Sequence, residues 1–193
     1  MRFLDWILMP FLKFCIWKFT VAKPFGIPLN ITGAFLLFLA MFFFLPFLSQ
    51  PPSEAYQYGR IIIAVLLVCY LCVIPHEYGH ALVARKLGYE VKDISLWAGL
   101  PSIDGDWYQR PAHEFIIGIA GPLVNAVLII LLLPIMLLNL YGEPPMISYV
   151  ASLFFMVNFI IMCFNLLPVY PMDGGRTCPC YCDVFHKRHY QSE

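Results

Sequence analysis

Four long apolar stretches dominate the sequence and restrict the folds that are open to it. A helix that crosses the ~30 Å hydrocarbon core of a bilayer needs about 20 apolar residues. The stretches cover approximately residues 30–48, 60–87, 114–140 and 146–166. The composition agrees, because 61% of the 193 residues are hydrophobic and only 12% are charged. The sequence therefore predicts an all-α membrane protein with about four transmembrane helices.

Residues 1–26 form a different kind of segment, in which aromatic and basic side chains are mixed. The segment has neither a clean apolar core nor a small-residue cleavage site, so we do not expect a removable signal peptide. Its composition is typical of an amphipathic helix that lies on the membrane surface. We expect an interfacial helix here, followed by a membrane core at residues 27–176. Outside the apolar stretches, residues 89–96 have the pattern of a short strand.

The basic residues are distributed unequally between the two sides of a four-span topology. One side receives both termini and the loop between the second and third spans. Of the 12 lysines and arginines, only Arg60 falls on the other side. Positive charge favours the cytoplasmic face, so both termini and the end of the second span are expected to be cytoplasmic. The net charge of zero argues against nucleic acid as a partner.

The second apolar stretch contains the segment His76-Glu77-Tyr78-Gly79-His80. Residues four apart lie on one face of a helix, so His76 and His80 can bind the same cation. Glu77 can hold a water beside the metal and take its proton, and Zn²⁺ lowers the pKa of such a water. Polar residues that only face neighbouring helices are the alternative, but ionisable groups are costly at membrane depth. The pattern favours a zinc-dependent hydrolytic site.

A catalytic zinc site usually takes three protein ligands and leaves one position for water. Asp173 follows the fourth apolar stretch and is a candidate for the third ligand. The prolines before it, Pro168 and Pro171, interrupt the helix, and the two glycines after it permit unusual backbone angles. A solvated aspartate in a turn is the alternative, and the residues alone leave both interpretations open.

Three blocks of sequence follow one another in a specific order. They comprise residues 76–81 with 84–88, residues 114–115 with 120–125, and residues 165–168 with 173–176. Together they resemble the site-2 protease family, the intramembrane zinc metalloproteases of peptidase family M50. The resemblance covers approximately residues 27–176, which is most of the chain.

The resemblance implies a role for each matching residue. His76, His80 and Asp173 would bind the zinc. Glu77 would act as general base and then as general acid. Asn125 matches a family asparagine that faces the active site and helps to bind or polarise the substrate. An amide in an apolar helix can donate to a developing oxyanion, and a hydrogen bond between helices is the alternative.

The implied activity is that of a zinc metalloendopeptidase that cuts transmembrane segments of protein substrates, as in regulated intramembrane proteolysis. One alternative is a catalytically impaired relative that binds such segments without cutting them. Another is a divalent-metal transporter, since histidines on spanning helices also line ion paths. The chain lacks the repeated halves common in transporters. No feature of the sequence identifies the substrate or the oligomeric state.

The sequence departs from the family pattern after Arg176, where relatives continue into further apolar helices. Residues 177–193 instead contain closely spaced cysteines and histidines: Cys178, Cys180, Cys182, His186 and His189. These residue types can bind a second metal, but the spacing is not that of a usual zinc finger. We favour a truncated or frame-shifted end. The catalytic residues precede this point, so we expect the chemistry, while the activity without further helices stays an open question.

Overall fold

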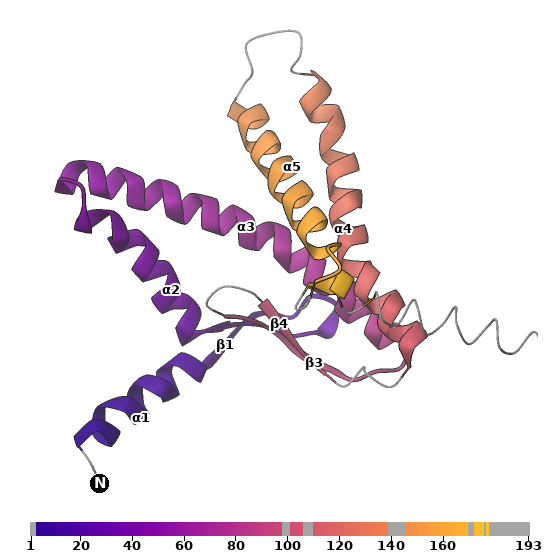
Figure 1. The fold of residues 1–193 in the computed structure, drawn as a ribbon, viewed down its shortest axis with the longest axis horizontal. Coiled ribbons are helices and arrows are strands. Elements are labelled where there is room, and N and C mark those ends of the chain that lie inside the picture. The colour runs from indigo at the N-terminus through magenta and orange to yellow at the C-terminus, as the bar shows by residue number, and fades with distance from the viewer. Residues whose placement is uncertain are drawn as a thin grey trace, which may run out of the picture. The chain divides into compact units, whose positions relative to one another are not determined.

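The computed structural model is mostly helical, with one small sheet (Figure 1). The chain forms two compact units, of which the first comprises residues 1–67 and 92–104 and the second residues 68–91 and 105–193. The structure describes residues 3–97, 101–105, 110–138, 146–169, 172–175 and 177. The cysteines and histidines of the atypical tail, residues 177–193, lie outside the described residues.

The first unit begins with helix α1 (Phe3–Ile16) and strand β1 (Lys18–Ala22). Strand β1 pairs antiparallel with β2 (Leu29–Thr32) through the short 3-10 turn η1 (Pro24–Gly26). The N-terminal segment was expected to be helical. It forms a helix at α1 but a strand at β1, and the location of α1 on a membrane surface stays a prediction. All five side chains of β1 are exposed, so the strand has no alternation of buried and exposed residues by which to recognise it.

Strand β2 also pairs, in parallel, with β3 (Val91–Leu96), and β4 (Pro101–Gly105) completes a sheet of order β1-β2-β3-β4. The short strand expected within residues 89–96 is confirmed by β3. The prediction of an all-α protein did not include the other three strands, and it is wrong in this respect. Its parallel pairing joins residues far apart in the chain, such as Leu29 and Ile94, and local periodicity carries no information on such a partner.

Helix α2 (Gly33–Phe44) and the 3-10 turn η2 (Leu45–Leu48) fill the first predicted span. The helix begins later than expected because Thr32 caps it, with its hydroxyl oxygen 3.2 Å from the Phe35 nitrogen. With 12 residues, α2 is about 18 Å long, which is short for a bilayer core of ~30 Å.

Helix α3 (Pro52–Lys86) begins at Pro52 rather than near Arg60, because proline suits the first position of a helix. It ends at Lys86, within one residue of the predicted end, and Gly88 follows with a φ of 90°, which is open to glycine at little cost. Helices α4 (Pro111–Leu138) and α5 (Met146–Asn165) belong to the second unit and run side by side (Figure 1).

Two helices, α3 and α4, are long and apolar enough to cross a membrane. The apolar part of α5, Tyr149–Asn165, and the segment Gly33–Leu48 are shorter. This pattern supports a predominantly helical membrane protein. The count of four spans stays a prediction.

Candidate metal centre

Helix α3 presents His76 and His80 one turn apart on the same face. Their ring centroids are 4.7 Å apart, and the ring planes are nearly perpendicular. The side chains are 2% and 8% exposed, so both imidazoles are shielded from water. Such burial of two polar rings is costly unless each finds partners.

Asp173 reaches these histidines because the chain turns back after α5. The turns are closed by backbone bonds from Val169 to Leu167 (2.8 Å) and from Met172 to Val169 (2.9 Å). Gly174 permits the close approach that follows, since a Cβ there would lie 2.5 Å from the Leu167 carbonyl oxygen. The breaks predicted from the prolines and glycines of this segment thus serve to position Asp173.

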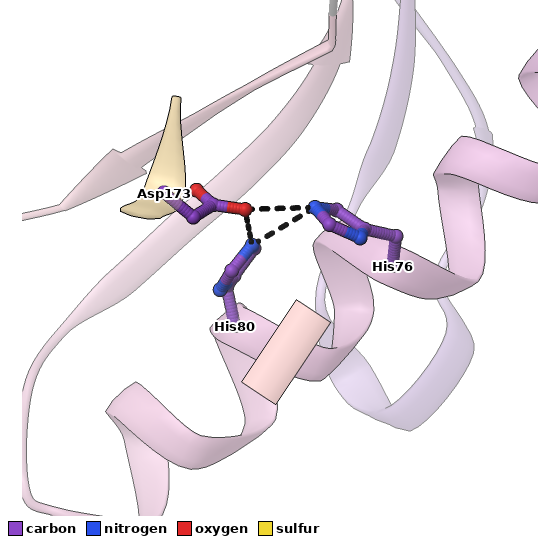
Figure 2. Close-up of side chains that lie close together, drawn as sticks. All are labelled: His76, His80 and Asp173. Atoms are coloured by element: carbon purple, nitrogen blue, oxygen red, sulfur yellow. Dashed lines mark hydrogen bonds and ion pairs between the residues drawn. The ribbon is translucent and has the colours of Figure 1, made fainter. Parts of the chain in front are cut away.

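The three side chains converge on one point (Figure 2). Asp173 Oδ2 lies 3.1 Å from His76 Nε2 and 3.2 Å from His80 Nε2, and the two nitrogens are 3.1 Å apart. For tetrahedral zinc with bonds of 2.0–2.1 Å, ligand atoms are ~3.3 Å from one another. The nearly equilateral triangle of donors therefore has the size that a zinc ion requires.

The hydrogen-bond partner at Nδ1 of each imidazole determines which ring nitrogen carries the proton. His80 Nδ1 lies 2.7 Å from the carbonyl oxygen of Ile117, which can only accept, so Nδ1 donates. His76 Nδ1 lies 2.8 Å from Asn125 Oδ1. In the neutral tautomers that donate from Nδ1, both Nε2 atoms keep a lone pair for a metal.

Three electron-pair donors at this separation repel one another unless a cation lies among them. The carboxylate is in the ionised form that a metal requires. Burial acts to raise the pKa of Asp173. When the rings of His76 and His80 also carry protons at Nε2, their hydrogen bonds and their charge outweigh burial and hold the pKa of Asp173 well below its usual range. Two imidazoles and one carboxylate suit zinc, so the residues present fit a zinc ion.

Glu77 follows His76 on α3 and is only partly buried. Its charge is close enough to act on His80. The structure thus places the predicted general base next to the donor triangle.

Asn125 lies on α4 on the opposite side of His76 from Asp173, because it contacts Nδ1 while Asp173 contacts Nε2. Its side chain is fully buried. Its oxygen faces His76, and its Nδ2 donates to Asn158 Oδ1 at 3.2 Å. These contacts suit the orientation of a ligand, and the predicted contact of Asn125 with substrate stays a prediction.

Gly121 on α4 is a feature of the site that the sequence analysis did not predict. A Cβ at this position would lie 2.7 Å from His76 Nε2 and closer still to His80 Nε2. The absence of a side chain therefore leaves room for the donor triangle. The signal was in the spacing, since Gly121 lies one helical turn before Asn125 and on the same face of α4.

His113, a histidine outside the donor triangle, lies in the first turn of α4. Its Nδ1 is 2.8 Å from the hydroxyl of Tyr89. Within the described part of the chain, the only group of three potential metal ligands is His76, His80 and Asp173.

The chain is similar to known proteins over the region that holds this centre. Residues 63–149 match the model of peptidase family M50. A site-2 protease from Methanocaldococcus jannaschii has a similar structure, with a TM-score of 0.56 and 29% sequence identity over 87% of this chain and 73% of the other. Over the region that holds the donor triangle, the chain is therefore similar to the site-2 protease family.

Two curated proteins are also similar to this chain. A zinc metalloprotease of Methanocaldococcus jannaschii is 35% identical over 161 residues, which are 80% of this chain and 42% of the relative. Stage IV sporulation protein FB of Bacillus subtilis is 30% identical over 58% of this chain and 38% of its own length. The chain thus spans about two fifths of the length of these relatives.

Proposed function

We propose that this chain is an intramembrane zinc metalloendopeptidase that cleaves transmembrane segments of protein substrates. The observation that supports the proposal most is the donor triangle of His76, His80 and Asp173, whose sides of 3.1 to 3.2 Å fit one zinc ion. The similarity to peptidase family M50 and the zinc metalloprotease name of a relative agree with it.

In this proposal the three ligands hold zinc, which when bound supplies a Lewis acid and lowers the pKa of a water. Glu77 takes the proton of the attacking water at its carboxylate and then delivers it to the nitrogen of the leaving amine. His76 and His80 stay neutral with their protons at Nδ1, so they neither donate to nor remove protons from the substrate. The burial of both rings excludes competing water from the ligand side.

The bilayer sets the requirements for the substrate. The backbone of a transmembrane helix is already hydrogen-bonded, so a scissile peptide must unwind before it can reach the site. We therefore propose that residues which weaken a helix lie near the cut. The distribution of basic residues supports a multi-pass topology with both termini and the site on the cytoplasmic side. The process would be regulated intramembrane proteolysis.

The test reconstitutes the full chain in liposomes with a model transmembrane peptide and measures cleavage and bound zinc together. Glu77→Gln should retain zinc and lose cleavage, because the amide cannot accept the proton. Glu54→Gln is the matched control, since Glu54 is exposed in the first turn of the same helix, and it should cleave normally.

Other outcomes distinguish the alternatives. Normal turnover by Glu77→Gln would refute the mechanism. Zinc in both proteins with no product from either would favour an impaired relative that binds transmembrane segments. Metal uptake into the liposomes without proteolysis would favour a transporter.

A further inference from the structure

Asn158 is a buried polar residue of α5 that plays no part in the mechanism above. Its side chain is 1% exposed, although the surrounding helix is apolar. Its Nδ2 donates to the carbonyl oxygen of Phe154 at 2.8 Å and to Cys72 Sγ at 3.2 Å. Its Oδ1 accepts from Asn125 Nδ2 at 3.2 Å. A buried amide is costly unless its N–H and C=O groups form hydrogen bonds, and both groups of Asn158 do so.

These contacts form a chain of hydrogen bonds with only one possible direction. The Phe154 carbonyl can only accept, so it fixes the amide nitrogen of Asn158 on its own side. The oxygen of Asn158 must then face Asn125 and accept from its nitrogen. The oxygen of Asn125 is thereby turned toward His76 Nδ1, which must donate.

The direction of the chain matters at the far side of His76. A proton at Nδ1 leaves Nε2 with the lone pair that faces Asp173 and His80. If Asn125 rotated its amide by half a turn, it would present an N–H group to Nδ1. That arrangement favours the tautomer with the proton at Nε2, which cannot bind a metal.

We propose that Asn158 is a positioning residue that keeps His76 in the metal-binding tautomer by fixing the orientation of the Asn125 amide. The inference rests on the proposed zinc site. It adds a residue from α5 to a centre whose ligands come from α3 and the segment after α5. Asn125 transmits the orientation, and the Phe154 carbonyl anchors it.

The first experiment measures the zinc affinity of the full-length protein in detergent by competition with a chelator. Asn158→Leu should weaken zinc binding by about 10- to 100-fold, the usual effect of losing a partner behind a metal-binding histidine. Asn165→Leu is the matched control. Asn165 lies on the same helix and donates to the Ile161 carbonyl, also four residues earlier, at 3.0 Å, so this variant should bind zinc normally.

A second background separates orientation from packing. Asn125→Asp places two equivalent acceptor oxygens behind His76, so no orientation is needed. In that background Asn158→Leu should not weaken zinc binding. An equal loss in both backgrounds would overturn the inference and assign Asn158 to helix packing.

The tautomer itself can be read in zinc-free protein from the ¹⁵N shifts of the His76 ring. The wild type should carry a proton at Nδ1, and Asn158→Leu should lower the fraction of rings that do. A wild type without a proton at Nδ1 would contradict the inference. A correct tautomer in a wild type that binds no zinc would instead overturn the proposed zinc site and leave the hydrogen-bond chain standing.

Discussion

The ion pair of the first compact unit and the polar chain of the second differ in their exposure to water. In the first unit, Lys18 and Asp93 form an ion pair of 2.9 Å between strands β1 and β3, and these side chains are 37% and 17% exposed. In the second unit, the polar chain from Asn158 through Asn125 to His76 is no more than 2% exposed.

This difference distinguishes an interaction that contributes to stability from interactions that position the metal ligands. A partly exposed ion pair contributes little to stability, so it can be removed at small cost. A buried set of amides and imidazoles is expensive to satisfy, and apolar residues of similar shape would pack more cheaply. Such a set in the second unit is therefore explained better by the metal centre than by stability. Substitutions in the two units should accordingly separate zinc binding from folding.

Gly121→Ala should have the largest effect on zinc. The new methyl group would lie within 2.7 Å of His76 Nε2, so the donor triangle cannot keep its shape. We expect zinc affinity to fall by about 100-fold or more, beyond the 10- to 100-fold typical of a lost partner behind a ligand. Chelator competition on the purified protein measures it.

The matched control for that substitution lies in the first unit. A Cβ at Gly59 would lie 2.6 Å from the carbonyl oxygen of Phe43, so Gly59→Ala also forces a backbone to move. It should lower stability and leave zinc affinity unchanged. Equal zinc loss in both variants would remove the distinction between the units.

Thr32→Val should lower stability by about 1–3 kcal/mol without affecting zinc. The hydroxyl of Thr32 is buried, accepts from the Phe35 nitrogen and donates to the Leu96 carbonyl at 2.8 Å. Valine has the same shape but makes neither bond. Denaturant unfolding in mild detergent gives the stability, and a bound-zinc assay provides the comparison. Loss of zinc from the folded variant would show that the units are coupled.

Asp93→Asn should have the smallest effect, and the effect should depend on pH. Burial acts to raise the pKa of Asp93, but hydrogen bonds from Ser95 and Lys18, with the Lys18 charge, hold the pKa below its usual range. The stabilisation is complete above the unfolded pKa of about 3.9 and is lost as the pH falls through the lower folded pKa. The variant should be less stable by at most about 1 kcal/mol at pH 7.

Unfolding of Asp93→Asn and the wild type at pH 7 and at pH 3 checks this prediction. The difference should shrink at the lower pH, and a difference that grew there would contradict it.

The sequence predicted the site better than the fold. Residues four apart on a helix share a face whatever surrounds them, so His76 and His80 could be paired from spacing alone. The residues around Asp173 predicted a turn but left its role open, and only the resemblance to the family assigned it as a ligand. The sheet was not predicted, since the partner of β2 is set by packing with a distant segment. Asn158 was missed because an asparagine in an apolar helix has no local signature for its partners.

The most direct test of the account is X-ray absorption at the zinc edge of the zinc-loaded full chain. The account predicts one zinc per chain, bound by two imidazole nitrogens and by oxygen at ~2.0–2.1 Å, with no sulfur. His76→Ala should remove that signal. A zinc–sulfur distance of ~2.3 Å would instead assign the metal to cysteines and contradict the proposed centre.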